Sequence, residues 1–181
     1  MSKIVNISAK VLEIPLKTTW QTSLYATNTR AHCIVRVVTE DGIRGYGEAS
    51  PAAAFMGETA YTMETVISRY LAPALAGKSV LDISMINDLM DRIIAGNTSA
   101  KAAVDIAVHD AAGKALKVPV YALLGGKRRD TFQLVWSMVV NDNYTSPSTT
   151  ITLPQTGTRR NYRSGALETR FCACFPDILS A

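Results

Sequence analysis

A stretch lined with small side chains, from Ser99 to Gly126, constrains this chain more than any other. Its spacing predicts a helix, because small apolar residues recur at steps of three and four: Ala100, Ala103, Val104, Ala107, Ala111 and Ala115. Such a face lets a neighbouring element approach the helix backbone closely. Val118-Pro119 is predicted to end the helix, since proline disfavours helical geometry in the residue before it. A short apolar turn closed by Gly125 and Gly126 follows.

Composition favours a soluble globular protein. A chain of 181 residues suits one domain, or one domain with an appendage, and 48% hydrophobic residues can build a core. The net charge of +4 is spread along the chain, which argues against a nucleic-acid partner. No apolar run approaches the ~20 residues of a membrane helix, and the amino terminus lacks a signal-peptide core. Three cysteines do not make a disulfide framework, so a cytoplasmic location is expected.

The amino-terminal third is predicted to form a three-stranded antiparallel meander. Residues 5–11 alternate apolar and polar side chains, as a half-buried strand does. Pro15 is predicted to end this strand, and residues 16–30 to form a long polar loop, a type that is usually functional. Residues 31–39 and 43–49 flank an Asp-Gly turn and predict a hairpin.

The second strand of this hairpin ends in a glycine-rich segment. Gly45 and Gly47 suggest either a close backbone approach or a bulge. A phosphate-binding loop is the weaker alternative, because no helix begins directly after them. Glu48 could act as a general acid or base. A carboxylate that is simply hydrogen-bonded at the strand end is the favoured interpretation.

Two amphipathic helices are predicted next, over residues 63–71 and 86–94, stopped by Pro73 and Gly96. Together with the helix from Ser99 they form a three-helix bundle, so the predicted fold class is α+β. Asp105 and His109 stand four residues apart, a spacing that could place two metal ligands on one face. The sequence offers no evident third ligand for such a site.

The last apolar run, residues 132–140, is predicted to be a strand covered on both faces, as in a barrel. Such a barrel needs eight strand-helix units over roughly 200 residues or more. Only 41 residues follow Val140. They contain seven threonines and four arginines but no lysine. Residues 142–181 show neither helical nor strand periodicity, so they are predicted to be irregular.

Several motifs, in order over some 140 residues, resemble the amino-terminal capping domain and first barrel strand of the mandelate racemase and muconate lactonizing branch of the enolase superfamily. They are DGIRGYGEA at 41–49, GNTSAKAAVDIA at 96–107, and a run from His109-Asp110 to the paired glycines. The motif positions expected to be structural are Gly45, Gly47, Glu48, Asp105, Asp110, Gly125 and Gly126. Residues 55–59 and 96–102 look most like dipeptide epimerases. Muconate cycloisomerases and N-acyl amino acid racemases stay close alternatives.

The resemblance implies a cap that lids a (β/α) barrel. In the complete family, the barrel holds Mg²⁺ on three carboxylates and uses lysines to move the α-proton of a small-molecule carboxylate substrate. Two cap loops, here 16–25 and 52–57, close over that substrate. The implied contact residues are Trp20, Leu24, Tyr25, Phe55, Met56 and Gly57.

The family pattern breaks off in the last third of the chain. No lysine follows Lys127, so the Lys-x-Lys base motif is absent, and neither catalytic residues nor magnesium ligands are expected in this chain. The expected organisation is a capping domain at 1–126, a linker with an orphan barrel strand at 127–141, and a tail at 142–181. The chain is expected to be a truncated relative with a tail translated out of frame; a natural disordered tail is the alternative.

Three functions of different kinds stay open. The first is an isomerase by descent that cannot catalyse alone. The second is a cap or assembly module that docks on a barrel from another chain. The third is a self-sufficient enzyme that uses Glu48, His109 or Asp110. Residues 132–140 are also expected to drive self-association, because an exposed apolar strand templates pairing.

Overall fold

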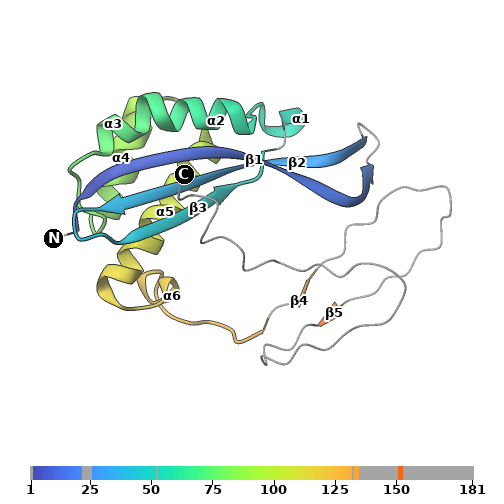
Figure 1. The fold of residues 1–181 in the computed structure, drawn as a ribbon. Helices are drawn as coiled ribbons and strands as arrows, with labels where there is room; N and C mark the ends of the chain where they lie inside the picture. Colours follow the sequence, from blue (N-terminus) through green and yellow to red (C-terminus); the bar gives the residue numbers. More distant parts are fainter. Residues whose placement is uncertain (1, 22–25, 52, 132, 135–150, 153–181) are drawn as a thin grey trace.

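A three-stranded antiparallel sheet forms the first layer of the molecule (Figure 1). The computed structural model describes residues 2–21, 26–51, 53–131, 133–134 and 151–152. The strands lie in the order β1 (Ile4–Gln21), β2 (Ala26–Thr39) and β3 (Arg44–Ala49). The predicted meander is therefore confirmed.

The Asp-Gly turn joins β2 to β3 as predicted. Gly42 has a φ of +80° and donates its N–H to the Thr39 carbonyl at 2.9 Å. The Asp41 carboxylate accepts hydrogen bonds from the hydroxyls of Thr39 (2.5 Å) and Ser2 (2.7 Å), which lower the pKa of Asp41. These bonds tie the turn to the start of the chain.

The predicted strand end at Pro15 and the predicted loop over residues 16–30 are wrong. Strand β1 continues to Gln21, and β2 begins at Ala26, so most of that segment is a hairpin arm that projects beyond the helices (Figure 1). Pro15 pairs with Thr29, and the register shifts between Pro15 and Trp20. Among the described strands β1 pairs only with β2, so it is an edge strand, where a proline without an N–H is tolerated.

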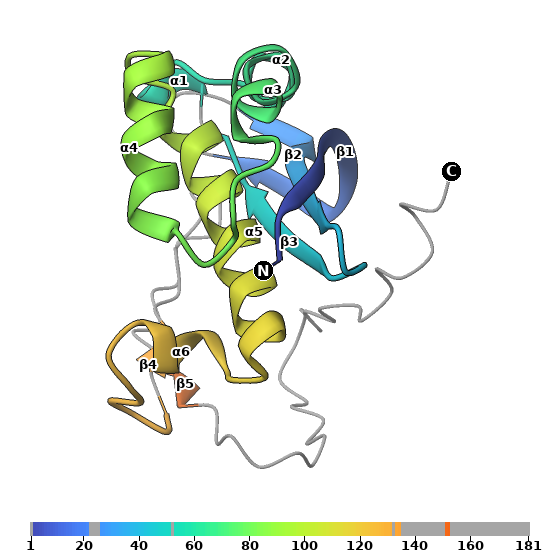
Figure 2. The same cartoon turned by 90° about the vertical axis from the view of Figure 1, so that its left-hand side faces the viewer.

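The helices cover one face of the sheet (Figure 2). Three helical segments make up the predicted bundle. They are the continuous run α2 (Ala60–Val66), η1 (Ile67–Leu71) and α3 (Ala72–Leu75), then α4 (Ile83–Ile93), then α5 (Thr98–Leu116). Two short helices lie outside the bundle, α1 (Ala53–Met56) and α6 (Val120–Leu123). The α+β class is confirmed.

The predicted helix stop at Pro73 is wrong, because the helix continues to Leu75. The turn before it is a π-helix, in which the Ala72 N–H donates to the Ile67 carbonyl five residues earlier. This wider turn changes the hydrogen-bond register just where Pro73 has no N–H to donate. The predicted stop at Gly96 is also displaced: α4 ends at Ile93, and Gly96 forms part of the left-handed turn into α5.

Helix α5 lies so close to β3 that their backbones nearly touch. A Cβ atom on Gly45 would lie 2.1 Å from the Ala107 carbonyl oxygen, and one on Gly47 would lie 2.0 Å from that of Ala103. Of the two interpretations of Gly45 and Gly47, the structure shows the close backbone approach. The alanine-lined face of α5 is what admits the strand.

Apolar side chains from the sheet and all three bundle segments fill the core between the two layers. The largest that are fully buried include Ile4, Met63, Ile67, Leu71, Leu75, Ile86 and Met90. Cys33 lies fully buried among them, and burial raises the pKa of its thiol to about 11.

Beyond residue 131 the structure describes only two short strands. β4 (Gln133–Leu134) pairs antiparallel with β5 (Ile151–Thr152). The pairing of β5 differs from the irregular structure predicted for residues 142–181, since the backbones of Ile151 and Leu134 are paired in register. The rest of the predicted strand 132–140 and of the tail lies outside the described residues. Within the described ranges, no helix combines the length and apolarity needed to cross a membrane.

Candidate functional site

An open concavity of about 310 Å³ lies at the root of the hairpin arm. It is formed where the beginning of β2 meets the segment from α1 to α2. Its lining residues are Thr27, Thr29, Arg30, Ala31, Pro51, Ala53, Glu58, Thr59, Ala60 and Tyr61. Of the two segments that the sequence suggested as substrate loops, the described part of the first, 16–21, is the outer end of β1, and the second contributes Ala53 to the lining.

Arg30, which lines this concavity, lies over a tryptophan ring of the arm. The guanidinium carbon of Arg30, on β2, lies 5.8 Å from the centre of the Trp20 ring, on β1. This is within the range of a cation–π contact. Of the other predicted contact residues on the arm, Leu24 and Tyr25 lie outside the described residues.

The segment opposite the arm carries the other predicted contact residues. Phe55 is part of α1. Met56 at the end of α1 is 60% exposed, and its sulfur accepts a hydrogen bond from the Ser99 hydroxyl at 3.5 Å. Gly57 follows in a left-handed conformation with a φ of +69°, which turns the chain toward α2.

Glu58 is the one buried carboxylate of the described core, and sequence reasoning gave it no role. Its two oxygens accept the backbone N–H groups of Ser99 (3.0 Å) and Ala100 (3.1 Å), in the first turn of α5. Asn97, the residue before that helix, makes no side-chain cap. Glu58 therefore satisfies the free N–H groups and places negative charge at the positive end of α5.

A second carboxylate links the sheet to α2 at the edge of the concavity. The Tyr61 hydroxyl donates a short hydrogen bond to Glu13 on β1, and this bond raises the pKa of Tyr61. Nearby, Thr59 and Thr62 form a reciprocal capping box at the start of α2. The bond from Tyr61 to Glu13 joins α2 to β1, and the capping box fixes the start of α2.

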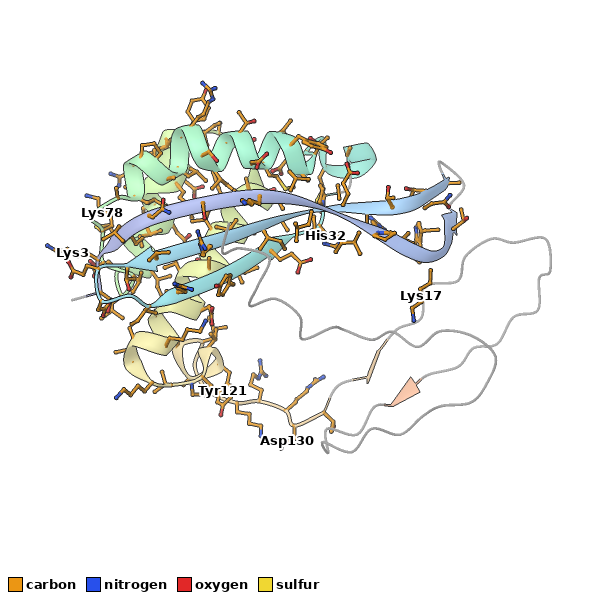
Figure 3. All side chains as sticks on the ribbon, in the orientation of Figure 1. Lys3, Lys17, His32, Lys78, Tyr121 and Asp130 are labelled. Atoms are coloured by element: carbon orange, nitrogen blue, oxygen red, sulfur yellow. The ribbon has the colours of Figure 1, made fainter. Side chains whose placement is uncertain are left out.

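Glu48 is bonded to a histidine at the end of β3. The Nδ1 atom of His32, labelled in Figure 3, lies 2.5 Å from the Glu48 Oε1 atom. The side chain of Glu48 is about half exposed, at 51%. This geometry agrees with the interpretation that the carboxylate is hydrogen-bonded at the strand end.

Asp105 and His109 pair with each other and with α4. The Asp105 Oδ1 atom accepts from the Asn87 amide at 2.8 Å and lies 3.3 Å from the His109 Nδ1 atom. Among the residues that the structure describes, no three Asp, Glu, His or Cys side chains gather to hold a metal ion. The described residues therefore do not fit a magnesium site.

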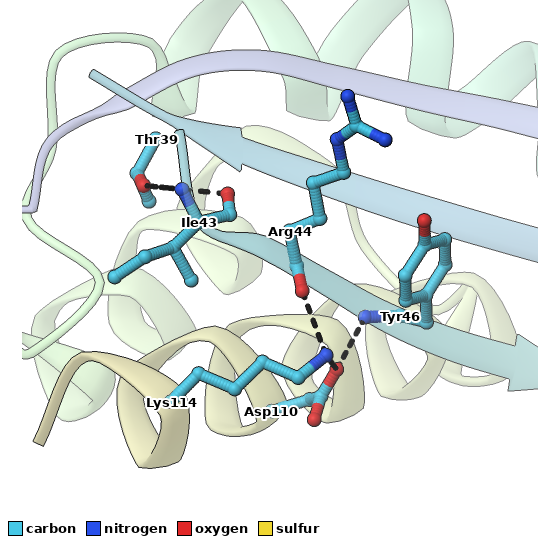
Figure 4. Close-up of polar contacts among 6 residues, drawn as sticks. All are labelled: Thr39, Ile43, Arg44, Tyr46, Asp110 and Lys114. Atoms are coloured by element: carbon cyan, nitrogen blue, oxygen red, sulfur yellow. Dashed lines mark hydrogen bonds and ion pairs between the residues drawn. The ribbon is translucent and has the colours of Figure 1, made fainter. Parts of the chain in front are cut away.

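Asp110 joins helix α5 to strand β3 (Figure 4). Its Oδ2 atom accepts the Tyr46 backbone N–H at 2.8 Å and the Lys114 ammonium at 2.6 Å, and Lys114 also donates to the Arg44 carbonyl at 2.7 Å. The contacts fix the strand and helix at the place of their close approach.

The paired glycines end the described helical part. Gly125 and Gly126 have φ values of +93° and +100°, and the Gly126 N–H donates to the Tyr121 carbonyl at 2.8 Å. Both conformations favour glycine.

Comparisons with known proteins match this same part of the chain. Residues 5–125 match the model of the mandelate racemase / muconate lactonizing enzyme, N-terminal domain. Chloromuconate cycloisomerase CbnB of Cupriavidus necator is 36% identical over 142 residues, and the L-Ala-D/L-Glu epimerase of Bacillus subtilis is 34% identical over 139 residues. Each match covers 77% of this chain and 38% of the relative.

A solved structure gives the same result. The dipeptide epimerase of Cytophaga hutchinsonii, solved with Mg and the dipeptide D-Ala-L-Val, superimposes with a TM-score of 0.72 at 35% identity. The match covers 78% of this chain and 38% of that one, so the chain spans well under half the length of its relatives. The fold, the spacing of the motifs and these matches together show that the chain belongs to the mandelate racemase / muconate lactonizing enzyme family of the enolase superfamily and contains its amino-terminal domain.

Proposed function

We propose that this chain acts as the substrate-capping part of a magnesium-dependent racemase, epimerase or cycloisomerase, and that its 181 residues do not catalyse on their own. The observation that carries the proposal is the family match over residues 5–125, which coincides with the described sheet and bundle. The concavity at the root of the arm is where this domain would face a substrate.

The chemistry of such a reaction explains why the cap and the catalytic barrel have different roles. A proton next to a carboxylate is weakly acidic, so its removal creates an enolate that needs a metal ion and other positive charge beside it. The described residues hold no set of three metal-ligating side chains, and no lysine follows Lys127 in the sequence. What this chain can supply is closure: the arm and the α1 segment exclude water and orient the outer end of the substrate.

A dipeptide is the substrate class that we propose for the complete enzyme, with muconate and N-acyl amino acids as alternatives. The relatives include an L-Ala-D/L-Glu epimerase and a chloromuconate cycloisomerase. We propose Trp20, Leu24, Tyr25, Phe55, Met56 and Gly57 as substrate-contacting residues and Gly45, Gly47, Glu48, Asp105, Asp110, Gly125 and Gly126 as structural ones. A cytoplasmic location stays a prediction from the sequence.

A proton-exchange assay tests whether this chain caps a catalytic barrel without catalysing by itself. We expect the purified chain, with Mg²⁺ and L-Ala-L-Glu in D₂O, to show no exchange of α-protons above the buffer background by proton NMR. Adding a separately produced barrel fragment of a related epimerase should raise exchange above that of the fragment alone. This gain would support a cap that can dock on a barrel from another chain.

Two outcomes would contradict the proposal. Exchange catalysed by the chain alone, lost in Glu48→Gln or Asp110→Asn, would identify a self-sufficient enzyme. A barrel fragment whose exchange and substrate affinity are unchanged by the chain would show that the chain does not cap it. Asp88→Asn, an exposed position on α4, is the matched control for the carboxamide substitutions.

Self-association through residues 132–140 is a further part of the proposal. The run FQLVWSMVV is apolar at most positions, and only Gln133–Leu134 within it are described. We expect the full chain to elute as oligomers in size-exclusion chromatography at concentrations where a chain ending at Gly126 elutes as a monomer. If both chains elute at the apparent mass of a monomer, this expectation is contradicted.

A further inference from the structure

Met56, at the end of α1, is the most exposed methionine in the part of the chain that the structure describes. It is 60% exposed, whereas Met63 and Met90 are buried in the core. Met85 on α4 is also open to solvent, with 43% of its surface exposed. A peroxide must reach the thioether sulfur to oxidise it to the sulfoxide. Exposure therefore makes Met56 and Met85 the accessible oxidation sites among these four residues.

A hydrogen-bond donor distinguishes Met56 from Met85. The Ser99 hydroxyl donates to the Met56 sulfur at 3.5 Å, and within the described residues the Met85 sulfur has no such donor. Ser99 is itself held in place, because its backbone N–H donates to Glu58 at 3.0 Å in the first turn of α5. A thioether sulfur is only a weak acceptor. The donor beside Met56 is thus fixed in position while the bond that it makes is weak.

The contact between Met56 and Ser99 joins two elements that lie 43 positions apart in the sequence. Helix α1 is a single turn of four residues, closed by the Gly57 N–H, which donates to the Ala53 carbonyl at 3.0 Å. Gly57 then turns the chain with a φ of +69°. A short helix of this kind gains little from its own hydrogen bonds. A stronger acceptor on Met56 would therefore stabilise α1 by fastening it to the start of α5.

We propose that Met56 is a reversible oxidation site whose sulfoxide accepts a stronger hydrogen bond from Ser99 and so holds α1 against α5. In the reaction, hydrogen peroxide transfers one oxygen to the sulfur. The O–O bond breaks, an S–O bond forms, the sulfur gives up two electrons, and the other oxygen leaves with both hydrogens as water. Methionine sulfoxide reductases return the sulfoxide to the thioether. This inference goes beyond the capping function and does not depend on it.

The test uses the full chain with Met85→Leu and Met138→Leu, treated with dilute hydrogen peroxide. Peptide mass spectrometry should find Met56 oxidised while the buried Met63 and Met90 stay thioethers. The Gly57 N–H should then exchange with D₂O about fivefold more slowly, as expected when one further hydrogen bond must break before α1 opens. A methionine sulfoxide reductase should restore the original exchange rate.

Matched variants in the same background separate the Ser99 bond from other effects of oxidation. Ser99→Ala should remove the slowing of Gly57 exchange, whereas Ser84→Ala, exposed on α4, should keep it. Met56→Leu should show no change in Gly57 exchange after peroxide treatment. Far-UV circular dichroism checks that each variant stays folded before and after treatment.

Three results would overturn the inference. The first is a Met56 that stays unoxidised in the unmodified chain under conditions that oxidise Met85. The second is an oxidised Met56 with unchanged or faster Gly57 exchange. The third is a slowing that persists in Ser99→Ala. None of them affects the capping function, which the assay with the barrel fragment tests on the unoxidised chain.

Discussion

Replacing Gly47 with alanine is expected to lower the free energy of unfolding by about 3 kcal/mol or more, at the upper end of what overpacking costs. The added Cβ would lie 2.0 Å from the Ala103 carbonyl oxygen and 2.8 Å from the Ala107 backbone nitrogen. Both neighbours are backbone atoms of α5, so no side chain can rotate away to relieve the contact. Strand β3 and helix α5 must separate, which also lengthens the hydrogen bond from the Tyr46 N–H on β3 to Asp110 on α5.

Urea denaturation followed by circular dichroism measures this loss. The matched control is Gly77→Ala, where a new Cβ meets no atom within 4 Å but the φ is +77°. That variant should cost about 1 kcal/mol, from backbone conformation alone. If Gly47→Ala costs no more than this control, the close approach of the two backbones does not exist in solution.

The position of β3 against α5 illustrates what the sequence could predict. The steps between the alanines predicted a helix with a face that admits close neighbours, and the glycines of β3 suggested a close approach. Neither pattern named the other as its partner, because the Asp110–Tyr46 contact spans 64 positions in the sequence.

The errors at the two prolines have one physical cause. A proline disrupts a strand or helix where its missing N–H would have had a partner, and in a helix also where its ring meets the carbonyl four residues earlier. Pro15 lies on an edge strand, and Pro73 follows a π-helical turn that shifts the hydrogen bonds. Both circumstances depend on tertiary structure, so reasoning from neighbouring residues placed the arm and the end of the first helix incorrectly.

The sequence predicted which segments carry the candidate site but not the contacts between them, because those contacts also depend on tertiary structure. Trp20 was predicted to be a contact residue because the family resemblance implied that residues 16–25 form a substrate-capping loop. The sequence placed Arg30 only at the end of a predicted loop. Its position over the Trp20 ring depends on the pairing of β1 with β2. Glu58 had no local signal at all, because its partners are 41 and 42 positions away.

Glu58 is where the second large effect is expected: Glu58→Ala should lower the free energy of unfolding by about 2–3 kcal/mol. The carboxylate is 8% exposed and accepts two backbone N–H groups at the start of α5. Removing it leaves both donors without a protein partner beside a helix whose first turn lacks a side-chain cap, and it also removes the charge that complements the helix dipole.

Two carboxamide variants distinguish this contact from an ordinary surface charge. Glu58→Gln keeps one acceptor oxygen but presents an amide donor to the second N–H, so it should lose about half as much stability as Glu58→Ala. Asp88→Asn, exposed on α4, should change stability by no more than about 0.5 kcal/mol. A loss of stability confined to Glu58→Ala and Glu58→Gln would show that this side chain stabilises the start of α5. Glu58 also lines the concavity, so one residue would then belong to both the candidate site and the helix cap. Equal, small effects in all three variants would instead show that water caps α5 as well as Glu58 does.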